Sequence, residues 1–339
     1  MRYIGSKAST VEVVRAIAVS AMAGRSCVAQ TFCDPFGGIG TISSKFKADG
    51  WSVTVADHLL FAHMYQRVRL ERNRSPSFTA LKKELEVKTQ GACQIESHLC
   101  SLPGRAGWVT ENFSGSRLFF TEENAMKIDA ILSRIYDWKE SKLISAFESQ
   151  VLLVSLINAA DKVANTAGTY YAHLKSFGRK SLQQLNLKII PPVFGARPAT
   201  CLMQDALDTV GSSYFDLLYL DPPYSARSYD RYYHFPQTIA LQEEPQCIGK
   251  GGLPTRNQIR SLFESPRTAS EAFSRLVEVA KFRVMIVQYS ATGIIPLRTI
   301  KDILSVRGKV SEYIVEASGY TTVSKPRREE QSLFVVHAR

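Results

Sequence analysis

Three short apolar runs that each end in an aspartate constrain the fold of this chain most. The runs are "VAQTFCD" (28–34), "WSVTVAD" (51–57) and "YFDLLYLD" (214–221). Their length and apolar character indicate buried strands. The glycine-rich turn "DPFGGIG" (34–40) and the helical spacing of "TISSKFKADG" lie between the first two runs. This strand–turn–helix–strand order opens a doubly wound α/β sheet, in which ligands bind beyond the carboxyl ends of the strands.

Strand signals stop after residue 58 and return near residue 199, and the stretch between them is dominated by helical spacing. We therefore expect a discontinuous catalytic domain (1–60 and 196–339) with a mainly helical insertion (61–195). Thr121 is the expected amino-terminal cap of one inserted helix. Further strands are predicted at "ATCLMQD" (199–205) and "FRVMIVQYS" (282–290). "SEYIVEA" and "SLFVVHA", joined through "SGYTTVSKPRREEQ", are predicted to close a mostly parallel sheet as an antiparallel pair.

Composition excludes several classes of protein. The longest apolar run, "VLLVSLINAA", is far shorter than the roughly 20 residues that cross a bilayer, and "MRYIGSKAST" lacks the apolar core of a signal peptide. We expect a cytoplasmic protein with no membrane partner. The six cysteines form no Cys-x-x-Cys pair, and "CQIESHLC" offers three ligands (Cys93, His98 and Cys100) where a structural zinc ion needs four. Free thiols and no metal are expected.

The glycine turn predicts a small cofactor. Its glycines let the backbone turn tightly and approach a ligand, and the helix that follows presents free N–H groups. The spacing does not match the Gly-x-Gly-x-x-Gly pattern of dinucleotide sites, and "GKGGLP" (249–254) does not match a phosphate-binding loop. Asp57 ends the next strand, where a carboxylate can accept hydrogen bonds from two ribose hydroxyls. A nucleoside-type cofactor without a pyrophosphate fits both features.

The tetrapeptide Asp221–Pro222–Pro223–Tyr224 predicts a site for an amino group. The two prolines remove two backbone donors and fix φ, so nearby carbonyls are held rigidly. The Asp221 carboxylate and the Pro222 carbonyl then supply two acceptors at the end of a strand. Tyr224 adds a flat face, and stacking of a base on such a ring contributes roughly 1–3 kcal/mol. A structural turn after an edge strand is the alternative, but the apolar run before Asp221 indicates a central strand.

"RYIGSK" (2–7), "DPFGGIG" and "DPPY", taken in this order, resemble the D12 class of adenine-specific DNA methyltransferases, which use S-adenosylmethionine. "FFTEENAMKIDAI", "NTAGTYYAHLK" and "RYYHF" extend the likeness over nearly the whole chain. The fold implied is a Rossmann-like methyltransferase. The sequence departs from the family at "YYHFPQT", where Pro236 and Gln237 replace the usual Leu-Glu before the threonine.

The resemblance implies a role for each matched residue. Tyr3 and Lys7 should contact the cofactor, with Lys7 near its carboxylate. Asp34 and the turn Phe36–Gly40, including Gly38 and Gly40, should surround the methionine part. Asp57 should bind the ribose, and Asp205 the adenine amino group of the cofactor. Asp221, Pro222 and Tyr224 should hold the target adenine, which must be flipped out of the duplex at a cost of a few kcal/mol.

The charge distribution agrees with a nucleic-acid partner. The net charge is +11, and residues 61–200 carry 19 Lys and Arg against 12 Asp and Glu. A basic surplus of this kind suits a polyanion, although a solvated surface has the same composition. We expect the insertion to bind phosphates of double-stranded DNA, with candidates in "HLKSFGRKS" (173–181) and near residue 82: Lys82, Lys83, Lys175, Arg179 and Lys180.

Other functions share some of these features. An RNA adenine methyltransferase presents the same flipped base to Asp221, and a protein glutamine methyltransferase also presents an NH2 group to two acceptors. The long basic insertion argues against the glutamine substrate. A DNA-binding module without catalysis is a different class, and the intact "DPPY" and glycine turn argue against it. A restriction–modification role, with a cognate restriction endonuclease, is the biological context that we expect.

Overall fold

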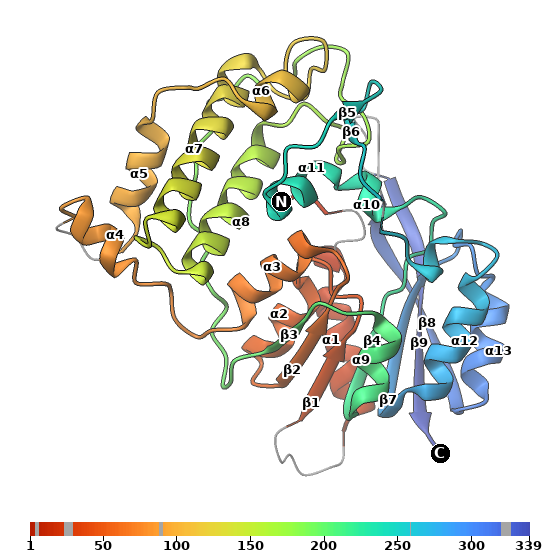
Figure 1. Cartoon of the computed structure of the whole chain (residues 1–339). Coiled ribbons are helices and arrows are strands. Elements are labelled where there is room, and N and C mark those ends of the chain that lie inside the picture. Colours follow the sequence, from red (N-terminus) through yellow and green to blue (C-terminus); the bar gives the residue numbers. More distant parts are fainter. Residues whose placement is uncertain (4–6, 24–29, 88–90, 258, 320–326) are drawn as a thin grey trace. The chain divides into compact units, whose positions relative to one another are not determined.

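The computed structural model describes residues 1–3, 7–23, 30–87, 91–257, 259–319 and 327–339. Residues 4–6 of "RYIGSK" and 320–326 of the expected turn between the last two strands lie outside this part. The chain divides into two compact units (Figure 1). We call Ile4–Asn73, Val193–Asp230 and Ile259–Arg339 the sheet unit. The helical unit consists of Met1–Tyr3, Arg74–Pro192 and Arg231–Gln258.

The sheet unit is built on a mostly parallel sheet with the strand order β3-β2-β1-β4-β7-β9-β8. The first five strands in this order pair in parallel, whereas β9 runs antiparallel to β7 and β8. The strands are β1 (Thr31–Asp34), β2 (Ser52–Ala56), β3 (Thr200–Leu202), β4 (Tyr214–Leu220), β7 (Lys281–Ser290), β8 (Gly308–Gly319) and β9 (Arg327–Ala338). The predicted sheet and its antiparallel closing pair are confirmed.

Helices cover both faces of this sheet, so its strands are apolar on both sides. Phe32, Leu217 and Tyr219 pack toward α1, α2 and α3, whereas Cys33 and Leu218 pack toward the opposite layer. The first layer comprises the short 3-10 turn η1 (Lys7–Ser9), α1 (Val11–Ala21), α2 (Thr41–Ala48) and α3 (Leu60–Leu70). The second comprises α9 (Ala206–Ser212), η2 (Leu262–Glu264), α12 (Ala269–Val279) and α13 (Leu297–Ser305). The doubly wound class predicted from the sequence is therefore observed (Figure 1).

The helical unit is organised around two long antiparallel helices. Its elements are α4 (Thr79–Glu84), α5 (Cys93–Ser101), α6 (Trp108–Phe113), α7 (Glu122–Glu140), α8 (Ala146–Val163), α11 (His234–Leu241), β5 (Cys247–Ile248) and β6 (Leu253–Pro254). Thr121 caps α7 by accepting a hydrogen bond from Asn124 N, as predicted, and Ser145 forms a capping box with Glu148. No helix in the described ranges is both long and apolar enough to span a bilayer.

The grouping of residues into units differs from the expected boundaries at two places. α3 lies in the sheet unit although the expected insertion begins at 61. The Lys47 ammonium from α2 donates there to the carbonyls of Leu70 and Arg72 at the end of α3. Residues 231–258 lie in the helical unit although they were expected in the catalytic domain. There Phe235 of α11 stacks on Tyr170 with ring centroids 4.9 Å apart. The short α10 (Tyr229–Tyr232) spans this boundary.

Candidate active site

Three aspartates lie at the carboxyl ends of neighbouring parallel strands. Asp34 ends β1, Asp57 follows β2, and Asp221 follows β4. The register pairs Asp34 with Val55 of β2 and Cys33 with Leu218 of β4, which brings the three strand ends to the same edge of the sheet. This edge is where an open α/β sheet binds ligands.

The Asp221 carboxylate is paired with the Lys7 ammonium. Lys7 Nζ lies 2.9 Å from Asp221 Oδ2, and Lys7 is almost fully buried. The second oxygen, Asp221 Oδ1, is buried and has no hydrogen-bond partner among the described residues. Burial raises the pKa of Asp221, and the charge of Lys7 opposes this shift. The site thus holds a carboxylate with one oxygen engaged by a cation and one open acceptor.

Asp34 is a second buried carboxyl with one open oxygen. Its Oδ2 accepts a hydrogen bond of 2.8 Å from Ser43 Oγ, whereas its Oδ1 has no partner within the described residues. Burial raises the pKa of Asp34 to about 7, with further contributions from the charges of Asp221 and Asp57 and an opposing one from Ser43. A cationic group at Oδ1 would relieve this shift.

Asp57 fixes the glycine turn to the end of β2. Its Oδ2 accepts from Gly38 N at 3.0 Å and its Oδ1 from Leu59 N at 2.9 Å. Gly40 has a left-handed φ of 76°, and a Cβ on Gly37 would lie 2.3 Å from a methyl carbon of Val55. Larger residues at these two positions would therefore displace the turn.

Gln66 of α3 supports the same turn and was not found by sequence reasoning. Its side chain is fully buried, and its Nε2 donates to Gly38 O at 2.9 Å. The available signal was weak: an uncharged polar residue within the amphipathic pattern of "LFAHMYQRVRL" (60–70). The turn is thus held from one side by Asp57 and from the other by Gln66.

Two further residues expected at the cofactor lie in the sheet unit. Asp205 follows β3, is exposed, and caps α9 by accepting from Leu207 N at 2.9 Å. Phe36 packs edge-to-face on Phe263, with ring centroids 5.0 Å apart. Asp205 therefore lies at the same edge of the sheet as Asp34, Asp57 and Asp221. It also has a structural role as a helix cap.

Tyr224 is held from behind by the segment that follows β7. Its ring contacts Tyr289 edge-to-face, with centroids 6.2 Å apart and planes at 80°, and its carbonyl accepts from Ile294 N at 3.1 Å. Tyr289 is fully buried, and a Cβ on Gly293 would lie 2.2 Å from its ring. The Lys7 ammonium lies 5.3 Å from the centre of the Tyr224 ring. Pro222 is buried and Pro223 half-buried.

The structure does not bring Tyr3 and Lys7 into one unit. Tyr3 lies in the helical unit, where its ring stacks on Tyr233 with centroids 4.8 Å apart and planes at 10°. Arg2 fixes this segment, because its backbone N donates to Asp161 Oδ2 at 2.7 Å and its guanidinium donates to Asp161 O at 3.0 Å. Lys7 belongs to the sheet unit. A shared role for the two residues stays a prediction.

The rings of "RYYHF" pack inside the helical unit. Tyr233, His234 and Phe235 are buried. The His234 Nε2 atom lies 2.7 Å from Tyr170 O, and burial lowers the pKa of His234 to about 4. Pro236 falls in the first turn of α11, where a missing N–H leaves no helical hydrogen bond unmade. The departure from the family pattern at Pro236 is therefore compatible with the helix.

The basic segment 173–181 is a loop. Asn165, which is buried, organises it: Nδ2 donates to Leu174 O at 3.2 Å, and Oδ1 accepts from Gly178 N and Ser181 Oγ at 3.4 Å each. The side chains of Lys175, Arg179 and Lys180 are exposed on this loop. Of the other two candidates, both on α4, Lys83 is exposed and Lys82 half-buried. The contact of these five residues with DNA stays a prediction.

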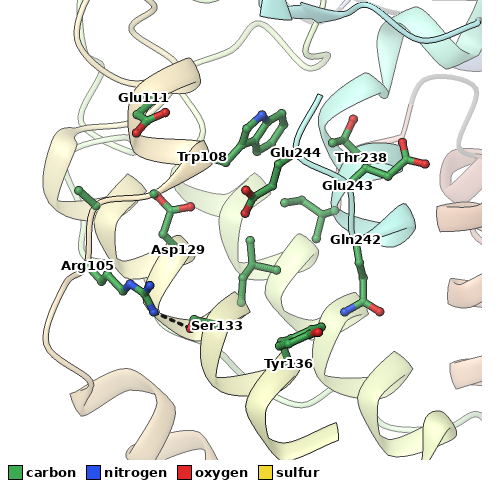
Figure 2. A pocket seen from close by; sticks show the side chains of 14 residues that line it. Arg105, Trp108, Glu111, Asp129, Ser133, Tyr136, Thr238, Gln242, Glu243 and Glu244 are labelled. Atoms are coloured by element: carbon green, nitrogen blue, oxygen red, sulfur yellow. Dashed lines mark hydrogen bonds between the residues drawn. The ribbon is translucent and has the colours of Figure 1, made fainter. Parts of the chain in front are cut away.

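A cavity of about 610 Å³ lies within the helical unit (Figure 2). Its lining includes Trp108 of α6, Tyr136 of α7 and the four carboxylates of Glu111, Asp129, Glu243 and Glu244, with Arg105 as the basic residue. Arg105 donates to Ser133 Oγ at 2.8 Å. The charged residues of this lining are mostly acidic, and the lining includes none of the residues expected at the active site. Within the described residues, no cluster of three or more His, Cys, Asp or Glu side chains could hold a metal ion.

Comparison with known proteins places these features in a family. A family model described as "D12 class N6 adenine-specific DNA methyltransferase" matches residues 3–300. The chain is 31% identical over 336 residues to the type II methyltransferase M.FokI of Planomicrobium okeanokoites, covering 98% of this chain and 51% of that protein. It is 32% identical over 315 residues to M.NlaIII of Neisseria lactamica, covering 91% of this chain and 89% of that protein. It is also 27% identical to the modification methylase LlaI of Lactococcus lactis subsp. lactis, covering 97% and 53%. The chain thus spans about half the length of the first and third relatives and most of the second.

Proposed function

The chain belongs to the D12 class of N6 adenine-specific DNA methyltransferases, and we propose that it methylates N6 of adenine at a specific sequence in double-stranded DNA. The observation that carries this proposal is Asp221 at the end of β4, whose Oδ1 is a buried acceptor without a partner among the described residues. With the carbonyl of Pro222, it would meet both hydrogens of an adenine amino group.

The Asp221 site suits a weak nucleophile. The exocyclic nitrogen of adenine has its lone pair delocalised into the ring, and two acceptors aimed at its hydrogens favour a pyramidal nitrogen with the lone pair freed. Lys7, 2.9 Å from Oδ2, favours the ionised carboxylate against the effect of burial. Asp221 would therefore bind and polarise the amino group. In-line displacement then depends on positioning more than on a strong base.

S-Adenosylmethionine is the cofactor of this family, and the residues at the glycine turn fit it. Bound there, it supplies a methyl group activated by a sulfonium. Asp34 Oδ1, a buried acceptor without a described partner, suits the ammonium of the methionine part. The Asp57 oxygens each accept one backbone N–H, and a carboxylate oxygen can accept a further bond, here from a ribose hydroxyl. Asp205 is the proposed contact for the adenine of the cofactor.

The target adenine must leave the duplex to reach Asp221. Flipping a base costs a few kcal/mol, and stacking on an aromatic ring returns roughly 1–3 kcal/mol. Tyr224 would supply that ring, and Tyr289 would hold it in place through their edge-to-face contact. One stacked ring and two hydrogen bonds are of the right order to offset the cost of flipping.

The helical unit would bind the phosphates. Lys175, Arg179 and Lys180 project from one loop that Asn165 holds in shape. Exposed cations on an ordered loop can contact successive phosphates with little further loss of conformational freedom. Lys82 and Lys83 on α4 are the second proposed group of phosphate contacts.

The names of the relatives support a biological role. M.FokI and M.NlaIII are named type II methyltransferases, and LlaI is named a modification methylase. We extend the proposal to a restriction–modification system, in which this chain protects DNA from a cognate endonuclease. If plasmid DNA from cells that express the chain stays sensitive to every endonuclease that cuts at the methylated motif, this role is wrong.

The direct test is methyl transfer by the Asp221→Asn variant. Asn keeps the volume but loses the carboxylate, so we expect the rate on DNA to fall by about 10²-fold or more, the typical effect of removing one preorganised polar group. Cofactor binding should be largely retained. Asp216→Asn in the same strand is the matched control, because Asp216 Oδ2 accepts from Thr31 N and Thr31 Oγ1 at 2.9 Å and serves the sheet.

Nucleoside mass spectrometry of the product completes this test. We expect N6-methyladenine in DNA with wild-type protein and with Asp216→Asn. Equal rates for Asp221→Asn and wild type would contradict the assignment of Asp221. The same assay on an RNA of matched sequence separates the DNA enzyme from an RNA methyltransferase, since only the latter would modify RNA faster.

A further inference from the structure

A buried polar network lies in the sheet unit next to the Lys7–Asp221 pair. Gln288 of β7 is its centre and has no exposed surface. Its Oε1 accepts from the Tyr219 hydroxyl at 2.7 Å, and its Nε2 donates to Thr10 Oγ1 at 3.2 Å and to Gln331 Oε1 at 2.6 Å. Tyr219, Thr10 and Gln331 are themselves buried. Four polar side chains from β4, β7, β9 and the amino-terminal segment are thus linked by hydrogen bonds through Gln288.

Thr10 links this network to the segment that carries Lys7. The Thr10 Oγ1 and N atoms donate to Lys7 O at 3.4 and 3.0 Å. Lys7 is the first residue of the single turn η1, and Thr10 follows η1 and directly precedes α1. Through Gln288, the Thr10 side chain therefore ties the backbone of Lys7 to the centre of the sheet. The Lys7 side chain then reaches Asp221, two residues after Tyr219.

We propose that Thr10 and Gln288 are positioning residues that hold the Lys7 ammonium against the Asp221 carboxylate. This inference rests on the proposed function, because it assigns the network a role in the chemistry of Asp221. A lysine side chain has several rotatable bonds, and a single-turn element such as η1 has few hydrogen bonds of its own. A hydrogen bond from outside η1, such as that between Thr10 and Gln288, would hold the Lys7 ammonium at a fixed distance from the Asp221 carboxylate.

The charged and titratable groups that face Asp221 determine how loss of the network should change the pKa of Asp221. Lys7 faces it from η1, Asp34 from β1 and Tyr219 from its own strand, and the centre of the Tyr224 ring lies 5.3 Å from the Lys7 ammonium. Among these groups, Lys7 is the basic one, and it forms the ion pair with Asp221. Burial raises the pKa of Asp221 and Lys7 lowers it. Moving the ammonium away should therefore raise the pKa at which Asp221 loses its proton.

The pair Thr10→Val and Thr10→Ser tests the proposal in the full chain. Valine keeps the shape of threonine but removes Oγ1, whereas serine keeps the oxygen. For methyl transfer by Thr10→Val, we expect the acid limb of kcat/KM against pH to move to higher pH by up to about one unit, because a cation at this distance lowers a carboxylate pKa by about 1–3 units. Thr10→Ser should keep the wild-type limb.

Two further variants keep the test decisive. Tyr219→Phe removes the hydrogen bond to Gln288 Oε1 with little change in shape, and it should move the limb in the same direction if Thr10→Val does not fold. Ser155→Ala is the control for stability, because it removes a buried hydroxyl of the helical unit that bonds Val151 O and Ile190 N. It should leave the limb unchanged.

The possible results are distinct. An acid limb that moves in Thr10→Val and stays in Thr10→Ser supports the positioning role. A uniform loss of rate at every pH, with the limb unmoved in Thr10→Val and Tyr219→Phe, overturns it and leaves the network a structural role. A wild-type protein that transfers no methyl group at any pH overturns the proposed function itself, and the positioning role with it.

Discussion

Asp34 is a single residue whose environment opposes its charge. Burial is the main reason that its pKa rises to about 7, against an ordinary value of about 3.9 in an unfolded chain. A carboxyl whose pKa is higher in the folded protein than in the unfolded chain binds its proton more tightly on folding. Its full contribution to stability is present only at pH values below the pKa of the unfolded chain. That stability is lost as pH rises from about 4 to about 7. The shift corresponds to roughly 4 kcal/mol. The substrate-free chain should therefore be less stable at pH 8 than at pH 5 on account of this residue.

Asp34→Asn tests this consequence of burial. Asn can still accept from Ser43 Oγ but carries no charge, so the thermal midpoint of the variant relative to wild type should rise between pH 5 and pH 8. Saturating S-adenosylmethionine should shrink the difference, because its ammonium would pair with the wild-type carboxylate. Differential scanning calorimetry measures both effects. A difference between variant and wild type that is the same at both pH values would contradict the account.

The sequence predicted the positions of those residues that show in the local pattern, and their roles stay predictions. Asp34, Asp57 and Asp221 each end an apolar run, and parallel strands bring such ends to one edge. The Lys7–Asp221 pair was not predicted, because it depends on where η1 meets the sheet. Gln66 and Gln288 were missed as well, since a glutamine in an apolar pattern does not reveal its partners.

Among the elements, the loop 173–181 has a structure that the local sequence pattern did not indicate. The backbone of this segment forms no helix. Hydrogen bonds with the Asn165 side chain hold it in place of helical hydrogen bonds. The sequence indicated a cluster of charges here but not its geometry, because an asparagine that bonds residues up to sixteen positions away leaves no periodic signal. Ordered by one buried side chain, the loop can present its cations in a fixed arrangement.

Charge reversal of this loop tests its proposed contact with phosphates. The triple variant Lys175→Glu, Arg179→Glu and Lys180→Glu should weaken DNA binding. It should also reduce the slope of log K against log salt by about 2 to 3, because each phosphate contact contributes about 0.9. The matched control reverses three exposed basic residues of the sheet unit: Lys281, Arg298 and Lys309. If both triples change the slope equally, the loop has no special role.

The segment after β7 is the second element that local patterns did not reveal. Gly293 has no room for a Cβ beside the Tyr289 ring, and Ile294 N bonds the carbonyl of Tyr224. Gly293→Ala should therefore shift Tyr289 and, through it, Tyr224. We expect kcat to fall while cofactor binding is retained.

Fluorescence provides a readout of this shift. 2-Aminopurine at the target position reports stacking, and we expect weaker quenching by Gly293→Ala than by wild type. Gly211→Ala in α9 is the control, because a Cβ there meets nothing within 4 Å. Unchanged quenching and unchanged kcat in Gly293→Ala would show that Tyr289 does not position Tyr224.

For the whole molecule, the order of motifs along the chain predicted the sheet and the helical unit more accurately than it predicted where each unit begins and ends. The doubly wound sheet, its antiparallel end and the helical second unit all follow from the pattern of strands and helices. The assignment of α3 and of residues 231–258 does not, because helical periodicity shows that a face is buried but not which element buries it. Those assignments required the contacts of Lys47 with Leu70 and of Phe235 with Tyr170.

We propose that this chain methylates adenine in DNA at one sequence through Asp221. Sequencing of genomic DNA from a host that expresses the chain, with detection of modified bases, tests it most directly. We expect N6-methyladenine at nearly every copy of a single motif, and none when the host expresses Asp221→Asn. Folded wild-type protein with no N6-methyladenine at any motif, or with methylated cytosine in its place, would contradict it.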